Sequence, residues 1–144
     1  MKLTSILIAS LLTGCATVNT GSTLYSTYES YRREVTSDNI QTSYAKYFSP
    51  ELISGKNIAN KEVQDQLLFK NGMLRIESHY EDIRGQKGCL TVNGYDKDAM
   101  PLSFNIEFTP DNQRWLIRAI DILFVDNVRD FSLKGRCPSD YINQ

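Results

Sequence analysis

Histidine and cysteine are scarce in this sequence, which has one histidine, His79, and three cysteines among 144 residues. They are not spaced as zinc ligands are, so no metal site is expected. Basic and acidic side chains almost balance, at 16 and 17, so nothing favours binding to nucleic acid. No apolar run reaches the roughly 20 residues that a permanent transmembrane helix requires. The composition therefore points away from zinc proteins, nucleic-acid-binding proteins and helical integral membrane proteins.

The chain also lacks the usual sequence signatures of enzymes. It contains no glycine-rich phosphate loop and no nucleophile with an obvious partner base. We therefore expect no cofactor, and motifs give an enzymatic role no support.

The first 15 residues have the layout of an export signal. Lys2 gives a positive start, residues 3–12 form a short apolar stretch, and small residues precede Cys15. The stretch is too short to span a bilayer permanently. Cleavage after Gly14 would leave 130 of the 144 residues, enough for one domain with its own core.

The motif Leu12-Thr13-Gly14-Cys15 resembles the lipobox of bacterial lipoproteins, in which a leucine and two small residues precede an invariant cysteine. The resemblance implies removal of residues 1–14 and acylation of Cys15, whose chains would form a lasting membrane anchor. Aspartate after the cysteine favours the inner membrane, so Ala16 implies the outer membrane, with the domain facing the periplasm. The alternative is an ordinary secretory signal that contains a chance cysteine.

Cys89 and Cys137 remain as an even pair once Cys15 is assigned to lipid. Exported proteins mature in an oxidising compartment, so we expect a disulfide between them, with two free buried thiols as the alternative. Residues 15–23 are the lipidated cysteine and a short polar tether, and residues 24–144 form a single domain with a C-terminal tail.

Three helices are predicted in the first half of this domain. Apolar and aromatic side chains recur at intervals of three and four from Leu24, which indicates a helix with one inward face. Pro50 ends the second helix, because the residue before a proline avoids helical angles. The predicted spans are residues 24–37, 39–48 and 60–72, with a brief strand or turn at 51–55.

After Gly72 the apolar period changes to two, which is typical of strands. A turn at residues 110–113 joins the third strand to a long apolar fourth strand. The predicted strands are residues 76–82, 89–95, 102–108 and 114–126. Three helices followed by an antiparallel meander make an α+β fold, in which the helices cover the apolar face of the sheet.

The register of the last hairpin decides the surroundings of Asp121. If Thr109 pairs with Arg114 and pairing continues unbroken, Asp121 lies opposite Leu102 and its carboxylate is buried. A bulge near residues 119–121 would turn Asp121 outward instead, and bring inward the side chains of Ile120, Ile122 and Phe124. We favour the bulge.

The order of elements and two segments, YFSPELI at residues 47–53 and RWLIRAIDI at residues 114–122, resemble the nuclear-transport-factor-2-like superfamily. The resemblance covers residues 24 to about 126 and implies a strongly curved sheet that forms a cone with an internal cavity. That superfamily includes dehydratases, isomerases and hydrolases as well as noncatalytic binding and assembly domains. Its enzymes generally use a His/Asp pair or clustered carboxylates inside the cone.

His79 and Asp121 are the two candidate catalytic residues. His79 shares a strand face with Glu77 and Glu81, and hairpin pairing is expected to add Thr91, Asn93 and Tyr95. These polar neighbours favour a solvated histidine, and a general base is the alternative. An unpaired Asp121 among apolar neighbours could act as an acid or base, whereas a bulge would turn it outward.

Five of the eight tyrosines fall on the first two predicted helices: Tyr25, Tyr28, Tyr31, Tyr44 and Tyr47. We expect them to pack in the core with hydroxyls at the rim. The alternative is an aromatic patch for a partner protein or the membrane interface.

These features favour an outer-membrane lipoprotein whose periplasmic domain acts by binding, as an accessory or assembly factor of an envelope complex. No basic face is evident, so membrane attachment rests on the acyl chains, and the expected partner is an envelope protein. One alternative is a small-ligand carrier that uses a cone cavity. The other is a cone-fold enzyme of the hydrolase or dehydratase type, built on Asp121.

Overall fold

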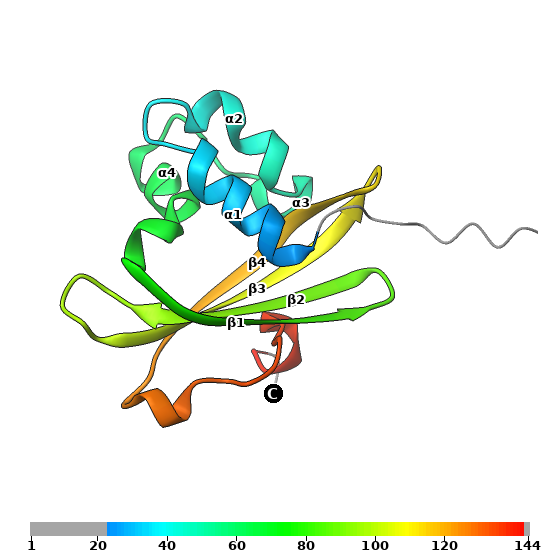
Figure 1. Ribbon diagram of the computed structural model, residues 1–144. Coiled ribbons are helices and arrows are strands. Elements are labelled where there is room, and N and C mark those ends of the chain that lie inside the picture. The colour runs from blue at the N-terminus through cyan, green and yellow to red at the C-terminus, as the bar shows by residue number, and fades with distance from the viewer. Residues whose placement is uncertain (1–22, 143–144) are drawn as a thin grey trace, which may run out of the picture.

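The computed structural model describes residues 23–142, which form an α+β domain with an open four-stranded sheet (Figure 1). The helices lie on one face of the sheet, and the C-terminal segment, residues 125–142, lies on the other. The predicted fold class is confirmed. The signal segment, Cys15 and most of the tether lie outside the described residues.

The first helix, α1 (Leu24–Glu34), follows the predicted pattern of buried side chains. Leu24, Tyr28 and Tyr31 are buried along one face. The Thr23 hydroxyl accepts the backbone N–H of Ser26 and so satisfies one of the free donors at the helix start. The predicted core packing of the tyrosines is confirmed for Tyr28, Tyr31 and Tyr47. The predicted position of the hydroxyls at the rim is wrong for Tyr28 and Tyr31, whose hydroxyls are buried.

Three further helices follow: α2 (Ile40–Tyr47), α3 (Pro50–Ile53) and α4 (Lys61–Leu67), with a 3₁₀ turn at Phe69–Gly72. The brief strand or turn predicted after Pro50 is wrong for the residues that form α3. Proline is tolerated in the first turn of a helix, and the Ser49 side chain accepts the backbone N–H of Leu52. Pro50 therefore ends α2 and also begins α3.

The sheet is the predicted antiparallel meander, in the order β1 (Arg75–Arg84), β2 (Lys87–Tyr95), β3 (Pro101–Asp111) and β4 (Arg114–Phe124). The predicted pairing of Thr109 with Arg114 is wrong, because Asp111 faces Arg114 and Thr109 faces Leu116. Asn112 and Gln113 both adopt positive φ angles. They make a tight two-residue turn whose twist suits the hairpin, so β3 continues to Asp111, further than predicted, and β4 begins at Arg114 as predicted.

A bulge in β4 confirms the favoured arrangement, although it lies at Arg118, one residue before the predicted range. Phe108 faces Ile117 whereas Glu107 faces Ala119, so Arg118 is the extra residue. Beyond it, Ile120 turns toward the helices and packs on the core, and Asp121 turns to the opposite face. The inward turn predicted for Ile122 and Phe124 does not bury them, because an open groove separates this end of β4 from α4.

Aromatic rings fill the space between the helices and the sheet. Tyr31 lies at the centre, with ring centroids 5.1 Å from Phe69 and 5.4 Å from Phe48. Its hydroxyl donates to the Leu67 carbonyl at 2.5 Å, so the polar end of this ring is satisfied inside the core. Phe69 in turn contacts Phe104 of the sheet at 5.4 Å.

Candidate functional site

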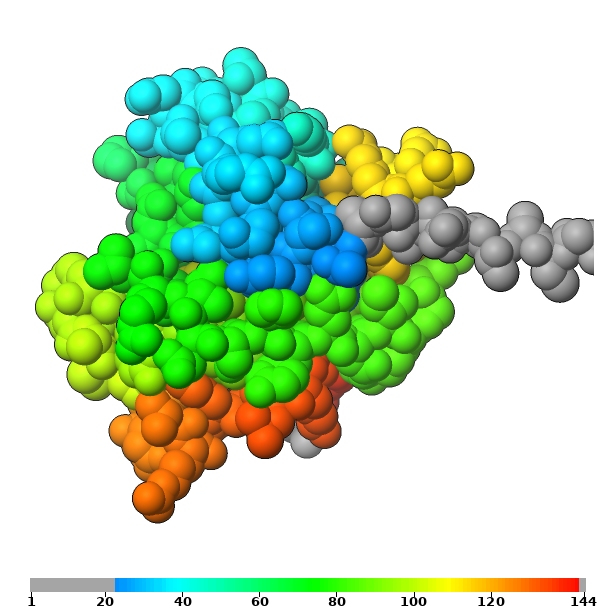
Figure 2. All heavy atoms as spheres, in the orientation of Figure 1, coloured from blue at the N-terminus to red at the C-terminus, as the bar shows by residue number. Residues whose placement is uncertain are grey.

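The C-terminal segment is irregular in backbone, yet it is held firmly against the outer face of the sheet, the face away from the helices. It contains two short 3₁₀ turns, Val128–Asp130 and Pro138–Asp140, and no strand. It protrudes beneath the sheet as a separate ridge (Figure 2). Irregular segments fixed on a rigid scaffold are where binding residues concentrate, so this segment is the candidate binding site.

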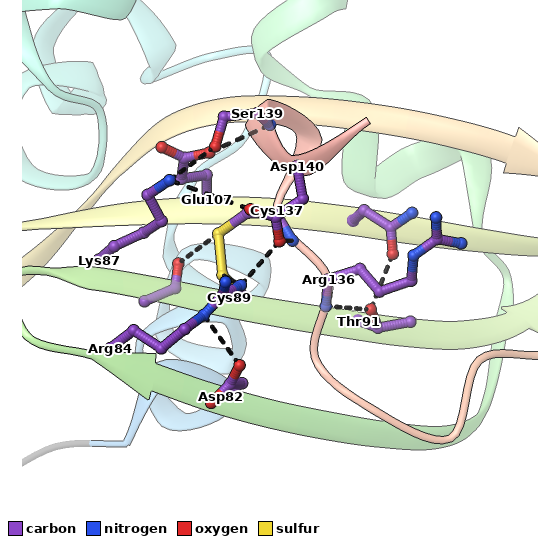
Figure 3. The surroundings of a disulfide bond; sticks show 12 residues. Asp82, Arg84, Lys87, Cys89, Thr91, Glu107, Arg136, Cys137, Ser139 and Asp140 are labelled. Atoms are coloured by element: carbon purple, nitrogen blue, oxygen red, sulfur yellow. Dashed lines mark hydrogen bonds and ion pairs between the residues drawn. A yellow bond between two sulfur atoms is a disulfide. The ribbon is translucent and has the colours of Figure 1, made fainter. Parts of the chain in front are cut away.

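A disulfide between Cys89 of β2 and Cys137 confirms the predicted pairing (Figure 3). Both cysteines are fully buried, and their Cα atoms are 4.7 Å apart. The backbone at Gly135 lies so close to the sheet that a Cβ there would be 2.3 Å from the Cys89 carbonyl oxygen and 2.6 Å from the Asp82 nitrogen. Glycine is therefore required at this point of contact.

A chain of hydrogen bonds joins the segment to three strands. Thr91 Oγ1 accepts the backbone N–H of Arg136 at 3.0 Å and donates to Asn105 Oδ1 at 2.7 Å. Asn105 Nδ2 donates to the Tyr141 hydroxyl at 2.9 Å, and this hydroxyl donates to Asp121 at 2.6 Å. Buried polar groups are costly unless paired, so this network fixes where the segment lies.

A second group of polar side chains holds the middle of the segment. Asn93 Nδ2 donates to the Ser132 carbonyl at 2.9 Å and to Ser78 Oγ at 3.0 Å. Ser103 Oγ donates to Asn93 Oδ1 at 2.7 Å. Alternation along β2 and β3 puts Asn93 and Ser103 on the outer face, and Ser78 of β1 faces Asn93 across the hairpin.

Glu107 is a buried carboxylate that the sequence reasoning missed. It is 2% exposed, and its oxygens accept from Arg118 at 3.1 Å and from the Ser139 backbone N–H at 3.3 Å. The sequence contains a sign of it, because Glu107 is an acidic residue within a mostly apolar central strand. Arg118 also approaches Glu51 at 3.5 Å, so it links α3 to the outer face.

Charged side chains surround the buried disulfide (Figure 3). Arg84 donates to Asp140 at 2.7 Å and to Cys89 Sγ at 3.1 Å, and it lies 3.0 Å from Asp82. The hydrogen bond from Arg84 lowers the pKa of Asp140 below its usual value. Lys87 donates to Ser139 Oγ at 3.0 Å. The Pro138–Asp140 turn is therefore bound to the β1–β2 hairpin through both Ser139 and Asp140.

Beside these charged side chains lies a depression of about 320 Å³. It is lined by Asp82, Arg84, Lys134, Gly135, Arg136, Asp140 and Tyr141. Arg136 stacks on the Tyr141 ring, with its guanidinium carbon 4.6 Å from the centroid. Leu133 stands next to the depression in sequence and is strongly exposed. An exposed apolar side chain next to charged groups of both signs is suited to protein recognition.

Asp121, a candidate catalytic residue, lies on the outer face within the hydrogen-bond network. It faces Asn105 across the strands and accepts from Tyr141. Burial, followed by the hydrogen bond to Asp121, raises the pKa of Tyr141 to about 12. The carboxylate therefore has a structural role in holding Tyr141, and its surroundings are polar.

His79 lies on the opposite face, where its ring stacks on Tyr25 with centroids 3.5 Å apart and planes 4° from parallel. The predicted grouping with Thr91 and Asn93 is wrong by one residue, because His79 faces Val92 across the hairpin. Neighbouring Glu81 accepts the backbone N–H groups of Leu24 (3.2 Å) and Tyr25 (2.7 Å), and so caps α1.

The structure therefore separates the two candidate catalytic residues by the thickness of the sheet, so they form no His/Asp pair. Within residues 23–142, the grouping of potential metal ligands is Cys89, Cys137 and Asp140. The two sulfur atoms are bonded to each other, and metal binding requires thiolates. In the described part of the chain, no helix is both long and apolar enough to cross a membrane.

No protein-family model, curated protein or solved structure matches this chain. The resemblances to the lipobox and to the nuclear-transport-factor-2-like superfamily therefore stay predictions.

Removal of the disulfide should lower the free energy of unfolding by about 4 kcal/mol, because the unfolded chain regains the freedom of a long loop. The double variant Cys89→Ala, Cys137→Ala tests this by urea denaturation. Wild-type protein treated with a reductant is the control and should show a similar loss. Equal stability of the variant and the oxidised wild type would contradict a stabilising role for the disulfide.

Tyr141→Phe should lower the free energy of unfolding by about 1–2 kcal/mol at neutral pH, because Asn105 and Asp121 each lose a partner. The raised pKa makes this contribution pH-dependent: it is complete below about pH 10, the unfolded value, and is lost as the pH rises through about 12. Urea denaturation at neutral and alkaline pH measures the difference between variant and wild type, which should shrink at high pH.

The matched control is Tyr80→Phe, since the Tyr80 hydroxyl makes no hydrogen bond to the described residues. A difference between Tyr141→Phe and wild type that stays constant with pH would refute the assignment.

Proposed function

We propose that this protein is a lipid-anchored binding domain of the bacterial outer membrane, and that its C-terminal segment (residues 125–142) is the surface presented to an envelope partner. The attachment of that segment carries the proposal. A disulfide, two hydrogen-bond networks and a guanidinium–aromatic stack hold an irregular backbone in one place. Such preorganisation reduces the entropy lost on binding.

The exposed side chains of the segment suit protein recognition. Leu133 is 76% exposed and therefore contributes little to folding. Lys134, Arg136 and Asp140 surround the adjoining depression, and such mixed charges favour a partner with complementary charges. An apolar side chain framed by charges is a common arrangement at protein interfaces.

The lipobox resemblance supplies the location. Eight residues separate Cys15 from Leu24, where α1 begins, and an extended chain of that length reaches about 30 Å at most. A lipid on Cys15 would therefore hold the domain close to the membrane surface, where envelope partners are concentrated.

The two alternatives have less support. A carrier needs an internal cavity, but fully buried side chains occupy the space between helices and sheet, including Tyr28, Tyr31, Phe48, Phe104 and Phe108. An enzyme built on Asp121 needs that carboxylate free, but it is bound to Tyr141 on the polar face. The binding role requires neither feature.

Lipidation is tested by metabolic labelling with a radioactive fatty acid. The wild type should carry label, whereas Cys15→Ser should remain as an unlabelled precursor, because the serine hydroxyl does not replace the reactive thiolate. The double variant Cys89→Ala, Cys137→Ala is the control and should be labelled like the wild type. Normal labelling of Cys15→Ser would defeat the lipid assignment.

The binding surface is tested with a photoreactive amino acid at Leu133 in the full chain, activated in intact envelopes. We expect a crosslinked partner from position 133. Position 74 is the matched control, because Leu74 is 73% exposed and precedes β1, outside the segment. The same products in equal amount from both positions would contradict a specific role for the C-terminal segment.

A further inference from the structure

The second half of β4 is an open sheet edge. β4 is the last strand of the sheet, and Ser49 N donates to the Ile117 carbonyl at 2.8 Å, which covers the edge before the bulge. Beyond Arg118, the backbone N–H of Val125 donates to Pro101 at 3.1 Å. Bonded and outward-pointing residues alternate along such a strand, so the outward-pointing N–H and C=O groups belong to Ile120, Ile122 and Phe124.

These three residues, named here the apolar edge, have no backbone partner among residues 23–142. Their side chains are hydrophobic, and Phe124 is 65% exposed. The other edge strand, β1, carries two carboxylates: Glu81, which caps α1, and Glu77, which pairs with Arg75 at a bulge. Charges of this kind prevent strand pairing at sheet edges, and the apolar edge lacks them.

We propose that two copies of this protein pair through the apolar edge, with their β4 strands antiparallel about a two-fold axis at Ile122. In this register Ile122 faces Ile122 of the second copy, and Ile120 faces Phe124. All three positions point their hydrogen-bonding groups outward, so each pair is of the bonded type and the strands exchange about six hydrogen bonds. The two sheets become one continuous sheet.

In the same register, the β4 side chains of the two copies are complementary in shape and charge. Phe124 of the second copy lies beside Ile120, at the mouth of a groove of about 370 Å³ whose apolar lining includes Leu52, Leu67 and Phe69. An aromatic ring placed in an apolar pocket is a typical interface anchor. On the outer side, Asp121 faces Leu123, so no like charges are opposed.

The sequence of the strand selects this register, in which the apolar edge is complementary to the same edge of a second copy. Moving the axis to Ile120 would set Arg118, at the bulge, against Ile122. Moving it to Phe124 would set Ile122 against Asp126, beyond the end of the strand. The axis at Ile122 pairs the whole apolar edge with itself. It also brings Arg118 of one copy near Asp126 of the other, and these side chains carry opposite charges.

Cysteine crosslinking of the full chain in intact envelopes tests the pairing. Ile122→Cys should form a disulfide-linked dimer on mild oxidation, because facing residues in bonded pairs have Cα atoms about 5.5 Å apart, within disulfide range. Co-expressed Ile120→Cys and Phe124→Cys chains should crosslink to each other more than either does alone. The matched control is Ile83→Cys, since Ile83 is 50% exposed on the other edge strand and Ile122 is 40% exposed.

Analytical ultracentrifugation in detergent gives a second measurement. The wild type should sediment as a dimer and Ile122→Lys as a monomer, because two lysines would face each other, whereas Ile83→Lys should remain dimeric. A dimer yield from Ile122→Cys no higher than that from Ile83→Cys would overturn the proposal, and so would a product containing a different protein. The pairing does not depend on Cys15, so failed lipid labelling leaves this test intact.

Discussion

The bulge at Arg118 is the constraint on which the rest of the structure depends. One extra residue in β4 changes the face of every side chain after it. Ile120 joins the core, and Asp121 reaches the outer face, where it receives the Tyr141 hydroxyl. Arg118 itself pairs with the buried Glu107. Without the bulge, a carboxylate would be buried among aromatic rings and the C-terminal segment would lose one of its attachments.

The single sheet serves two different environments. Toward the helices it presents apolar side chains, among them Phe104, which contacts Phe69. Phe69 in turn stacks on Tyr31, whose hydroxyl is satisfied by a backbone carbonyl. Away from the helices it presents a row of small polar side chains that bind the C-terminal segment. The disulfide at Cys89 lies on the polar side. It joins the C-terminal segment covalently to β2, where the hydrogen bonds are individually weak.

Local patterns in the sequence predicted much of this fold. The helical spacing after Leu24 and the period of two after Gly72 gave the order of elements, because both periods follow from backbone geometry alone. The pairing of Cys89 with Cys137 followed from the number of cysteines and from the predicted export. Pairings across turns were less predictable, because they depend on φ angles that turn residues adopt in context. Thr109 was placed two residues out of register across the turn at Asn112 and Gln113, and His79 one residue out across the hairpin that turns at Gly85.

The sequence by itself determined the α+β class and the two cysteines that form the disulfide, since these depend on short-range pattern and on counting. The tertiary structure decided where the candidate residues lie: His79 and Asp121 on opposite faces, Glu107 buried beside Arg118, and the C-terminal segment as part of the folded domain. The physical reason is that a face is set by cross-strand register, and register is fixed by long-range packing that no local pattern records.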